Sequence, residues 1–147
     1  MPLKTFKATV KRKKGLAVEA ESRGFKIIGD EPEDLGGTNT GMNPVELLLS
    51  SLGSCQTIAV ATFAQRQGII LKDFWVELEG DLDTDGFLGL SDVRPGYQNI
   101  RVNMHIKTDA SKEQVEKFIQ FVEKHCPVGD SIGNGVKIDP AKITIEP

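Results

Sequence analysis

The stretch that decides the fold, residues 41–68, reads GMNPVELLLSSLGSCQTIAVATFAQRQG. Asn43 suits a helix N-cap, Pro44 suits the first helical position, and Glu46 stands where a capping box places an acid. Gly68 supplies a stop signal. The pattern therefore predicts one helix from Pro44 to just before Gly68, roughly 36 Å long. Its apolar residues occupy more than one face, which is typical of a mostly buried core helix.

The centre of this helix carries an unusual group of small residues. Ser50, Ser51, Gly53 and Ser54 surround Cys55. A glycine inside a helix costs roughly 1 kcal/mol against alanine. A helix that accepts this cost commonly lets another chain segment approach closely or leaves room beside a reactive atom. Cys55 is therefore the first candidate for chemistry.

The remaining elements are predicted from apolar periodicity. They are two or three strands within 3–29 with a hairpin turn at 11–15, strands over 69–82 and 97–107 separated by a turn at 83–86, a helix from 111 to 125, a short element near 130–132, and a last strand over 142–145. This order of strands, helix, strands, helix and strand favours the α+β class. The length predicts a single domain over residues 1–147.

Two local signals refine this picture. Ser111 with Gln114 forms a capping box at the start of the second helix, which ends before Pro127. The loop over 30–42 contains Gly36-Gly37 and offers a weak signal for an anion cradle. Because this loop matches neither the Walker pattern nor the dinucleotide fingerprint, we assign no phosphate site to it.

Composition limits the possible classes of protein. Hydrophobic content of 39% and charged content of 27% are ordinary for a globular chain. A net charge of −3 gives no indication of nucleic acid or an anionic membrane as partner. Lysines interrupt any apolar run near the N-terminus, so we expect no signal peptide and a cytoplasmic protein. Serine, glycine and glutamine interrupt the apolar stretch of the central helix, so we expect no membrane span.

The chain has two cysteines, Cys55 and Cys126, at a separation of 126 − 55 = 71 positions. A structural disulfide is improbable in a reducing cytosol, and this spacing is no Cys-x-x-Cys motif. Cys55 lies within a packed helix, whereas Cys126 lies at a frayed helix end beside Pro127. This asymmetry suits a rigidly held peroxidatic thiol and a mobile resolving thiol. Alternatively, both are small buried hydrophobes without reactivity.

Two segments together resemble the OsmC/Ohr family of thiol peroxidases: Asn43-Pro44-x-Glu46-Leu47 followed by Cys55, and Cys126-Pro127-Val128. The resemblance covers nearly the whole chain. It implies an OsmC-like fold, with long central helices packed against antiparallel β-sheets in an intertwined homodimer. It also implies a peroxiredoxin-like antioxidant enzyme of the oxidative stress response. Such an enzyme reduces organic hydroperoxides through a two-cysteine cycle, uses no cofactor and is restored by an external dithiol reductant.

The resemblance also suggests which residues assist the thiols. An ordinary thiol is only a few per cent thiolate at neutral pH, so a peroxidatic cysteine needs a nearby cation. Arg12 matches the position of the family's essential arginine, and Arg23 is the alternative. The family's acid directly follows the Asn-Pro pair, where this chain has Val45. Glu46, one place later, is the candidate acid, although it lies roughly 13 Å along the helix from Cys55.

The departure at Val45 keeps a second hypothesis open. The chain would then be a non-enzymatic or ligand-binding OsmC-like dimer with buried, unreactive thiols. A metal site is not expected, because Cys55, Cys126, His105 and His125 lack the spacing of zinc ligands.

Overall fold

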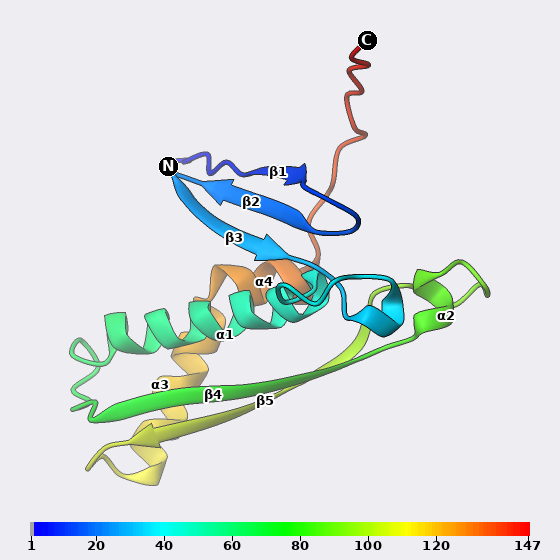
Figure 1. The fold of residues 1–147 in the computed structure, drawn as a ribbon. Helices are drawn as coiled ribbons and strands as arrows, with labels where there is room; N and C mark the ends of the chain where they lie inside the picture. The colour runs from blue at the N-terminus through cyan, green and yellow to red at the C-terminus, as the bar shows by residue number, and fades with distance from the viewer. Residues whose placement is uncertain (1) are drawn as a thin grey trace. The chain divides into compact units, whose positions relative to one another are not determined.

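The structure is a computed structural model that describes residues 2–147. Its contacts divide the chain into two compact units, one ending at Ser50 and the other beginning at Ser51. The chain combines helices with antiparallel strands, which agrees with the predicted α+β class (Figure 1).

The first unit contains a three-stranded antiparallel sheet. Its strands are β1 (Thr9–Arg12), β2 (Val18–Ser22) and β3 (Phe25–Gly29), in the order β1-β2-β3. Two or three strands were predicted within 3–29, and the structure has three. The first turn lies later than the predicted 11–15, since β1 continues through Arg12. Ser22 pairs with Phe25, which leaves a two-residue turn at Arg23 and Gly24. Both turn residues have positive φ, at 52° and 86°. A two-residue hairpin turn requires these angles to match the twist of the strands that it joins.

The loop after β3 is built around the buried carboxylate of Asp30, which is 2% exposed. Oδ2 accepts hydrogen bonds from the hydroxyls of Thr38 and Thr40, at 2.6 and 2.7 Å, and from both backbone amides, each at 3.2 Å. Oδ1 accepts from the amide of Glu31 at 2.8 Å. These bonds, with that of Thr38 the largest cause, hold the pKa of the Asp30 carboxyl well below its usual range. The anion that this loop holds is therefore the chain's own carboxylate.

Two glycines of this loop permit close backbone contacts. A Cβ on Gly37 would lie 2.0 Å from the carbonyl oxygen of Glu31, and one on Gly41 would lie 2.2 Å from that of Ile28. No side chain fits at these distances, so steric contact explains the glycines that resembled a phosphate loop.

Helix α1 (Pro44–Phe63) begins at the predicted capping box. The amide of Asn43 donates to Glu46 Oε1 at 2.9 Å, and the amide of Glu46 donates to Asn43 Oδ1 at 2.9 Å. The helix ends at Phe63, four residues before the predicted end, and turns lead to Gly68 at φ 71°. The predicted start, which depends on local hydrogen bonds, is confirmed. The predicted end was placed too far along the chain.

The prediction that α1 is mostly buried is wrong for the single chain. The buried residues are Leu52, Gly53, Gln56, Ala59 and Val60, whereas Ile58 is 66% exposed. By length and composition alone, α1 also meets the criterion for a membrane span, with a mean hydropathy of 1.3. A soluble protein's core helix meets the same criterion, so this is weak evidence for a membrane.

The second unit contains the long antiparallel hairpin β4 (Asp73–Leu82) and β5 (Tyr97–Lys107). The strand predicted over 69–82 therefore begins at Asp73, four residues later than predicted. The predicted turn over 83–86 is a short helix, α2 (Thr84–Phe87), because the Asp83 carboxylate caps it by accepting from the amide of Asp85. The predicted strand over 97–107 is confirmed.

Two further helices follow the hairpin, α3 (Lys112–Lys124) and α4 (Pro127–Asn134). The Ser111 hydroxyl accepts from the amide of Gln114 at 3.2 Å, which confirms the predicted cap. The short element expected near 130–132 is the eight-residue helix α4. The hydrophobic core of this unit joins the second half of α1 to α3, through Ala59, Val60, Ala64, Ile69, Phe118 and Val122.

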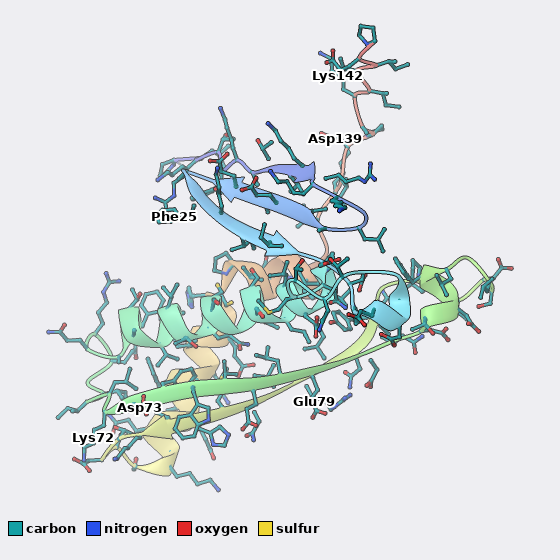
Figure 2. All side chains as sticks on the ribbon, viewed as in Figure 1. Phe25, Lys72, Asp73, Glu79, Asp139 and Lys142 are labelled. Atoms are coloured by element: carbon teal, nitrogen blue, oxygen red, sulfur yellow. The ribbon has the colours of Figure 1, made fainter. Side chains whose placement is uncertain are left out.

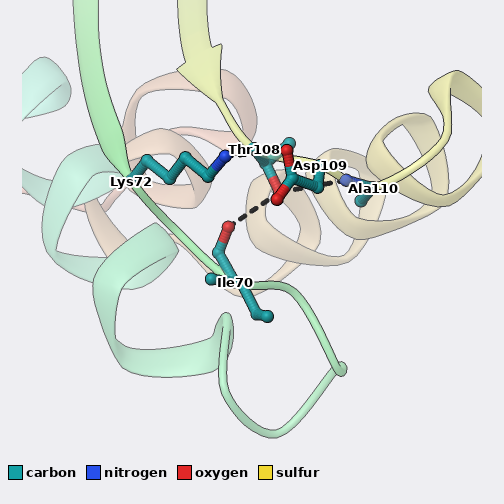
Figure 3. A network of polar contacts seen from close by, with 5 residues as sticks. All are labelled: Ile70, Lys72, Thr108, Asp109 and Ala110. Carbon is teal, nitrogen blue, oxygen red and sulfur yellow. Dashed lines mark hydrogen bonds and ion pairs between the residues drawn. The ribbon is translucent and has the colours of Figure 1, made fainter.

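A polar network fixes the start of β4 to the loop between β5 and α3 (Figure 3). Lys72 Nζ lies 2.7 Å from Asp109 Oδ1, and the Thr108 hydroxyl donates to the carbonyl of Ile70 at 2.7 Å. The same hydroxyl accepts from the amide of Ala110. The contacts hold the open end of the hairpin in register and position the first turn of α3.

The prediction of a last strand over 142–145 is wrong. Residues 135–147 have no regular secondary structure and are exposed, with Ile145 at 88%. Figure 2 shows Asp139 and Lys142 on this extended segment. A strand requires a partner for its backbone groups, and among residues 2–147 no strand pairs with this segment.

Candidate functional site

The second half of α1 and the start of α4 bring the two cysteines together. Cys126 Sγ donates to Cys55 Sγ across 3.0 Å, and both thiols are free. A disulfide bond is about 2.05 Å long, so the sulfurs need to approach by only about 1 Å to bond. The prediction placed both cysteines in one site, and the structure does bring them into contact; their catalytic roles stay a prediction.

The setting of Cys126 differs from the frayed helix end that its neighbours Pro127 and Gly129 suggested. Cys126 is 1% exposed and is the N-cap of α4, with Sγ accepting from the amide of Gly129 at 3.4 Å. Proline at the first helical position starts this helix rather than leaving a loose end. The expectation of a frayed helix end at Cys126 is therefore wrong, because a second helix begins immediately; a mobile resolving thiol stays a prediction.

Burial is the main cause that raises the pKa of the Cys126 thiol, and the hydrogen bond to Cys55 adds to it. The amide of Gly129 acts in the opposite direction but does not outweigh burial. Cys126 is therefore protonated near neutral pH and can act as the S–H donor, while Cys55 acts as the acceptor.

A pocket of about 240 Å³ opens beside Cys126. Its walls come from α1, β5, α3 and α4. They consist of Leu52, Gln56, Ile100, Val102, Glu123, Cys126, Gly129, Ile132 and Gly133. Most of this lining is apolar, and the described residues contribute one charge, at the exposed Glu123. The pocket thus offers a mostly apolar volume in contact with Cys126.

Gln56 is a polar residue of this pocket that the sequence analysis missed. It follows Cys55 directly, is 5% exposed, and its Oε1 is buried without a hydrogen-bond partner among the described residues. One sequence signal could have indicated it: a glutamine stands at an inward position of an otherwise apolar helix. Buried polar groups are nearly always hydrogen-bonded, so this exception requires an explanation.

Gly53 explains part of the small-residue group on α1. A Cβ there would lie 2.7 Å from Leu78 Cδ1 and 3.2 Å from Val76 Cγ1, both of β4. The missing side chain therefore lets the helix pack closely on the hairpin. Cys55 lies in the same turn of α1, two residues after this close contact.

Arg12 and Glu46 lie in the first unit, and each has a local hydrogen bond. Arg12 is exposed on β1 and donates through Nε to the carbonyl of Gly15 at 2.8 Å. Glu46 completes the cap of α1 with Asn43. The guanidinium of Arg23 lies 5.2 Å from the Phe25 ring. A role toward the thiols stays a prediction for Arg12, Arg23 and Glu46.

Both histidines have partners of their own. His105 Nε2 lies 2.6 Å from Glu77 Oε1, and its ring stacks on Trp75 at 4.6 Å. His125 Nδ1 lies 2.8 Å from the carbonyl of Phe121. Across residues 2–147, no group of three histidine, cysteine or acidic side chains could hold a metal ion.

The fold and the site define a class: α+β chains whose central helix and a following helix cap carry two thiols in contact. A family model described as OsmC-like protein matches residues 37–141. The chain belongs to the OsmC-like protein family. The predicted family and the OsmC-like fold are thereby confirmed.

Two relatives share modest sequence identity with this chain. A hydroperoxide reductase of Mycoplasma genitalium is 25% identical over 120 residues, which cover 79% of this chain and 78% of that protein. The uncharacterized protein YmaD of Bacillus subtilis is 28% identical over 113 residues, which cover 73% and 71%.

Solved structures support the same fold. The OsmC-like protein from Mycoplasma pneumoniae is 25% identical with a TM-score of 0.79, over 88% of this chain and 87% of that one. An organic hydroperoxide resistance protein from Legionella pneumophila is 22% identical with a TM-score of 0.70, over 92% and 93%. At that identity the second comparison shows the fold alone.

Proposed function

We propose that this protein is a thiol-dependent peroxidase that reduces organic hydroperoxides through Cys55 and Cys126. Its family and the hydroperoxide reductases among its relatives support a peroxide-related role. The observation that carries the two-cysteine cycle is the 3.0 Å contact between the two free thiols, beside an apolar pocket. A structural pair of unreactive thiols has no need of such a pocket.

In the first step the Cys55 thiolate attacks the distal oxygen of the hydroperoxide. A sulfur–oxygen bond forms, the oxygen–oxygen bond breaks, and the alkoxide leaves and takes a proton to become an alcohol. Cys55 is oxidised by two electrons to a sulfenic acid, and the peroxide is reduced by the same two electrons. The buried S–H of Cys126 holds the Cys55 sulfur in place before the attack.

In the second step Cys126 attacks the sulfur of the Cys55 sulfenic acid. A disulfide forms, and the hydroxyl leaves with the proton of Cys126 as water. The attacking sulfur needs little movement, because the two sulfurs already touch. An external dithiol then reduces the disulfide by thiol–disulfide exchange and restores both thiols.

The assisting residues belong to the same proposal. Arg12, with Arg23 as the alternative, supplies the cation that favours the thiolate, and Glu46 orients it. A guanidinium keeps its charge at all relevant pH values and its donors suit peroxide oxygens. No metal or organic cofactor has a step in this cycle.

We place this peroxidase in the cytoplasm as a single domain over residues 1–147 that forms a homodimer. Exposed apolar side chains support the dimer, since Ile58 on α1 and Ile143 and Ile145 in the last segment are largely uncovered. Sedimentation velocity tests it: we expect a dimer for the wild type, and an Ile58→Glu variant that shifts toward the monomer.

The test of the enzyme follows dithiothreitol-driven loss of cumene hydroperoxide. Cys55→Ser should lose turnover by at least about a thousandfold, because a serine hydroxyl is a far weaker nucleophile than a thiolate. Ser51→Ala, an exposed change one turn earlier on the same helix, is the matched control and should keep wild-type rates. Wild-type turnover in Cys55→Ser would rule out the proposed role of this cysteine.

The second candidate is a ligand-binding protein with unreactive thiols, favoured by Val45 in the position of the family's acid. The two readings differ in redox chemistry. The peroxidase forms an internal disulfide after mild peroxide treatment, whereas the binding protein keeps both thiols reduced.

A further inference from the structure

The charge of the chain is distributed unevenly along its length. Residues 2–29, which contain the three-stranded sheet, carry eight lysines and arginines against two glutamates, a net charge of +6. The whole chain has a net charge of −3, so the other residues together carry −9 (−3 − 6). Positive charge gathered on one part of an acidic protein attracts anions to that part. The three-stranded sheet is therefore the place to look for an anionic ligand.

A pocket of about 560 Å³ lies beside the turn between β2 and β3. The Ser22 hydroxyl donates to the backbone carbonyl of Lys7 at 2.7 Å, which fixes the N-terminal segment alongside this turn (Figure 1). The lining belongs entirely to the first unit and consists of Lys4, Thr5, Phe6, Lys7, Ser22 and Arg23. Three of these six residues are cations, and none is acidic.

The three cations of this pocket are not neutralised by the chain itself. Two other lysines of the sheet pair with Glu19, at 3.2 and 3.8 Å. Within the described range 2–147, no ion pair includes Lys4, Lys7 or Arg23. Lys4 Nζ lies instead 5.4 Å from the centre of the Phe6 ring. The pocket thus combines uncompensated positive charge with an exposed aromatic ring.

The backbone of Arg23 is a second, independent indication of a ligand. Arg23 has φ 52° at the first position of a two-residue turn, where asparagine, aspartate and glycine are favoured. A larger side chain in this conformation costs free energy, and such residues are concentrated at functional sites. The turn therefore keeps an unfavourable residue whose side chain lines the pocket.

We propose that this pocket binds a small organic phosphate, with the phosphate held by Lys4, Lys7 and Arg23 and an aromatic group packed against Phe6. Guanidinium donors match pairs of phosphate oxygens, and the two ammonium groups supply the charge that a dianion requires. The volume is in the range of small-molecule sites. The inference does not rest on the proposed peroxidase, and its test measures binding without turnover.

Isothermal titration calorimetry of the full-length chain at low ionic strength compares three probes. 1-Naphthyl phosphate carries the phosphate and the ring, 1-naphthol lacks the phosphate, and inorganic phosphate lacks the ring. We expect 1-naphthyl phosphate to bind at least about tenfold more tightly than either of the others, and more weakly as salt is added. Equal affinity for 1-naphthol or for inorganic phosphate, or no binding of 1-naphthyl phosphate, overturns the inference.

Single charge removals locate the site. Lys4→Gln and Lys7→Gln should each weaken binding of 1-naphthyl phosphate by about fivefold. Lys14→Gln, which removes the same charge from the other turn of the sheet and lies outside the lining, is the matched control. It should change the dissociation constant by less than about 1.5-fold. Equal weakening in all three variants would mean that net charge alone attracts the probe, and this result overturns the pocket.

Substitution of Arg23 separates ligand binding from a structural role. Arg23→Asn places a residue suited to positive φ in the turn, so Tm should rise while 1-naphthyl phosphate binds about tenfold more weakly. Arg23→Lys keeps the charge without the fork and should bind with intermediate affinity. Wild-type affinity in Arg23→Asn overturns the role of this arginine in the site.

A phospholipid headgroup offers the same phosphate, so a second arm distinguishes the two sources. Vesicles of phosphatidylcholine and phosphatidic acid are pelleted with the wild type, which should stay in the supernatant. Pelleting that Lys7→Gln abolishes and Lys14→Gln retains would overturn the assignment to a free organic phosphate in favour of a lipid headgroup.

Discussion

The loop at Asp30 and the pocket at Gln56 each bury a polar side chain, but they treat it in opposite ways. The Asp30 carboxylate receives five hydrogen bonds from the chain around it. The buried oxygen of Gln56 receives none from the described residues. Both groups are almost fully shielded from solvent, so burial alone does not distinguish them.

The difference separates a loop whose buried polar group has all its hydrogen bonds from a helix in which one buried oxygen has none. A buried group with all its bonds made stabilises one conformation of the backbone, and here that backbone is the loop that leads into α1. A buried group with a bond left unmade lowers stability unless something else supplies the donor. Substitutions should therefore affect stability at Asp30 and chemistry or binding at the pocket.

The largest expected effect is at Cys126. Cys126→Ser should complete one turnover per chain and then stall, with steady-state consumption of cumene hydroperoxide lowered by about a thousandfold, because no thiol resolves the sulfenic acid. Stopped-flow measurement should detect a burst of one equivalent. The Tm of this variant should change little. Continued turnover, or a large fall in Tm, would contradict the prediction that Cys126 acts in the chemistry rather than in stability.

Asp30→Asn should have the opposite profile. The substitution removes the charge that five donors stabilise, so Tm should fall by several degrees while peroxidase activity per folded molecule is retained. The pKa of Asp30 is lowered by folding, so its contribution is complete above the ordinary value of 3.8 and is lost as pH falls below it. The gap in stability between wild type and variant should therefore be smaller at pH 3 than at pH 7, which urea titrations at the two pH values would measure.

A smaller effect concerns the pH dependence at Cys126. Folding raises the pKa of this thiol above the ordinary value of 9.0, so its contribution is complete below that pH and is lost as pH rises. Wild-type stability should decline between pH 9 and pH 10 more than that of Cys126→Ala. Parallel curves for the two proteins would contradict the assigned burial of a protonated thiol.

The smallest effect is at Gly53, where α1 packs on β4. Alanine gains roughly 1 kcal/mol of helix propensity but pushes against the ends of Leu78 and Val76. Because a flexible side-chain end can yield, Gly53→Ala should change the free energy of unfolding by less than about 1 kcal/mol. Gly53→Leu cannot be accommodated in this way and should cost several degrees of Tm, and equal stability of both variants would exclude a close helix–sheet contact.

The sequence predicted what local hydrogen bonds decide. The caps at Asn43 and Ser111 follow from side chains that bond within four residues, and both starts were placed correctly. The strands over 18–29 and 97–107 follow from alternation and turn residues, and they were also recovered.

Features that depend on distant partners could not be read from the sequence. The segment over 142–145 has the alternation of a strand, but it lacks a partner among the described residues. The proline after Cys126 predicted the end of a helix at this residue. In the structure Cys126 is buried and caps the start of a second helix. Gln56 is one polar position on the helix, and the burial of its oxygen without a hydrogen-bond partner among the described residues depends on the tertiary fold.

The central claim is that Cys55 and Cys126 form one redox pair. The most direct test is intact mass measurement under non-reducing conditions after one equivalent of cumene hydroperoxide. The account predicts a loss of about 2 Da, from two hydrogens removed as the disulfide forms. An unchanged mass, or a stable gain of about 16 Da from a sulfenic acid that Cys126 does not resolve, would contradict it.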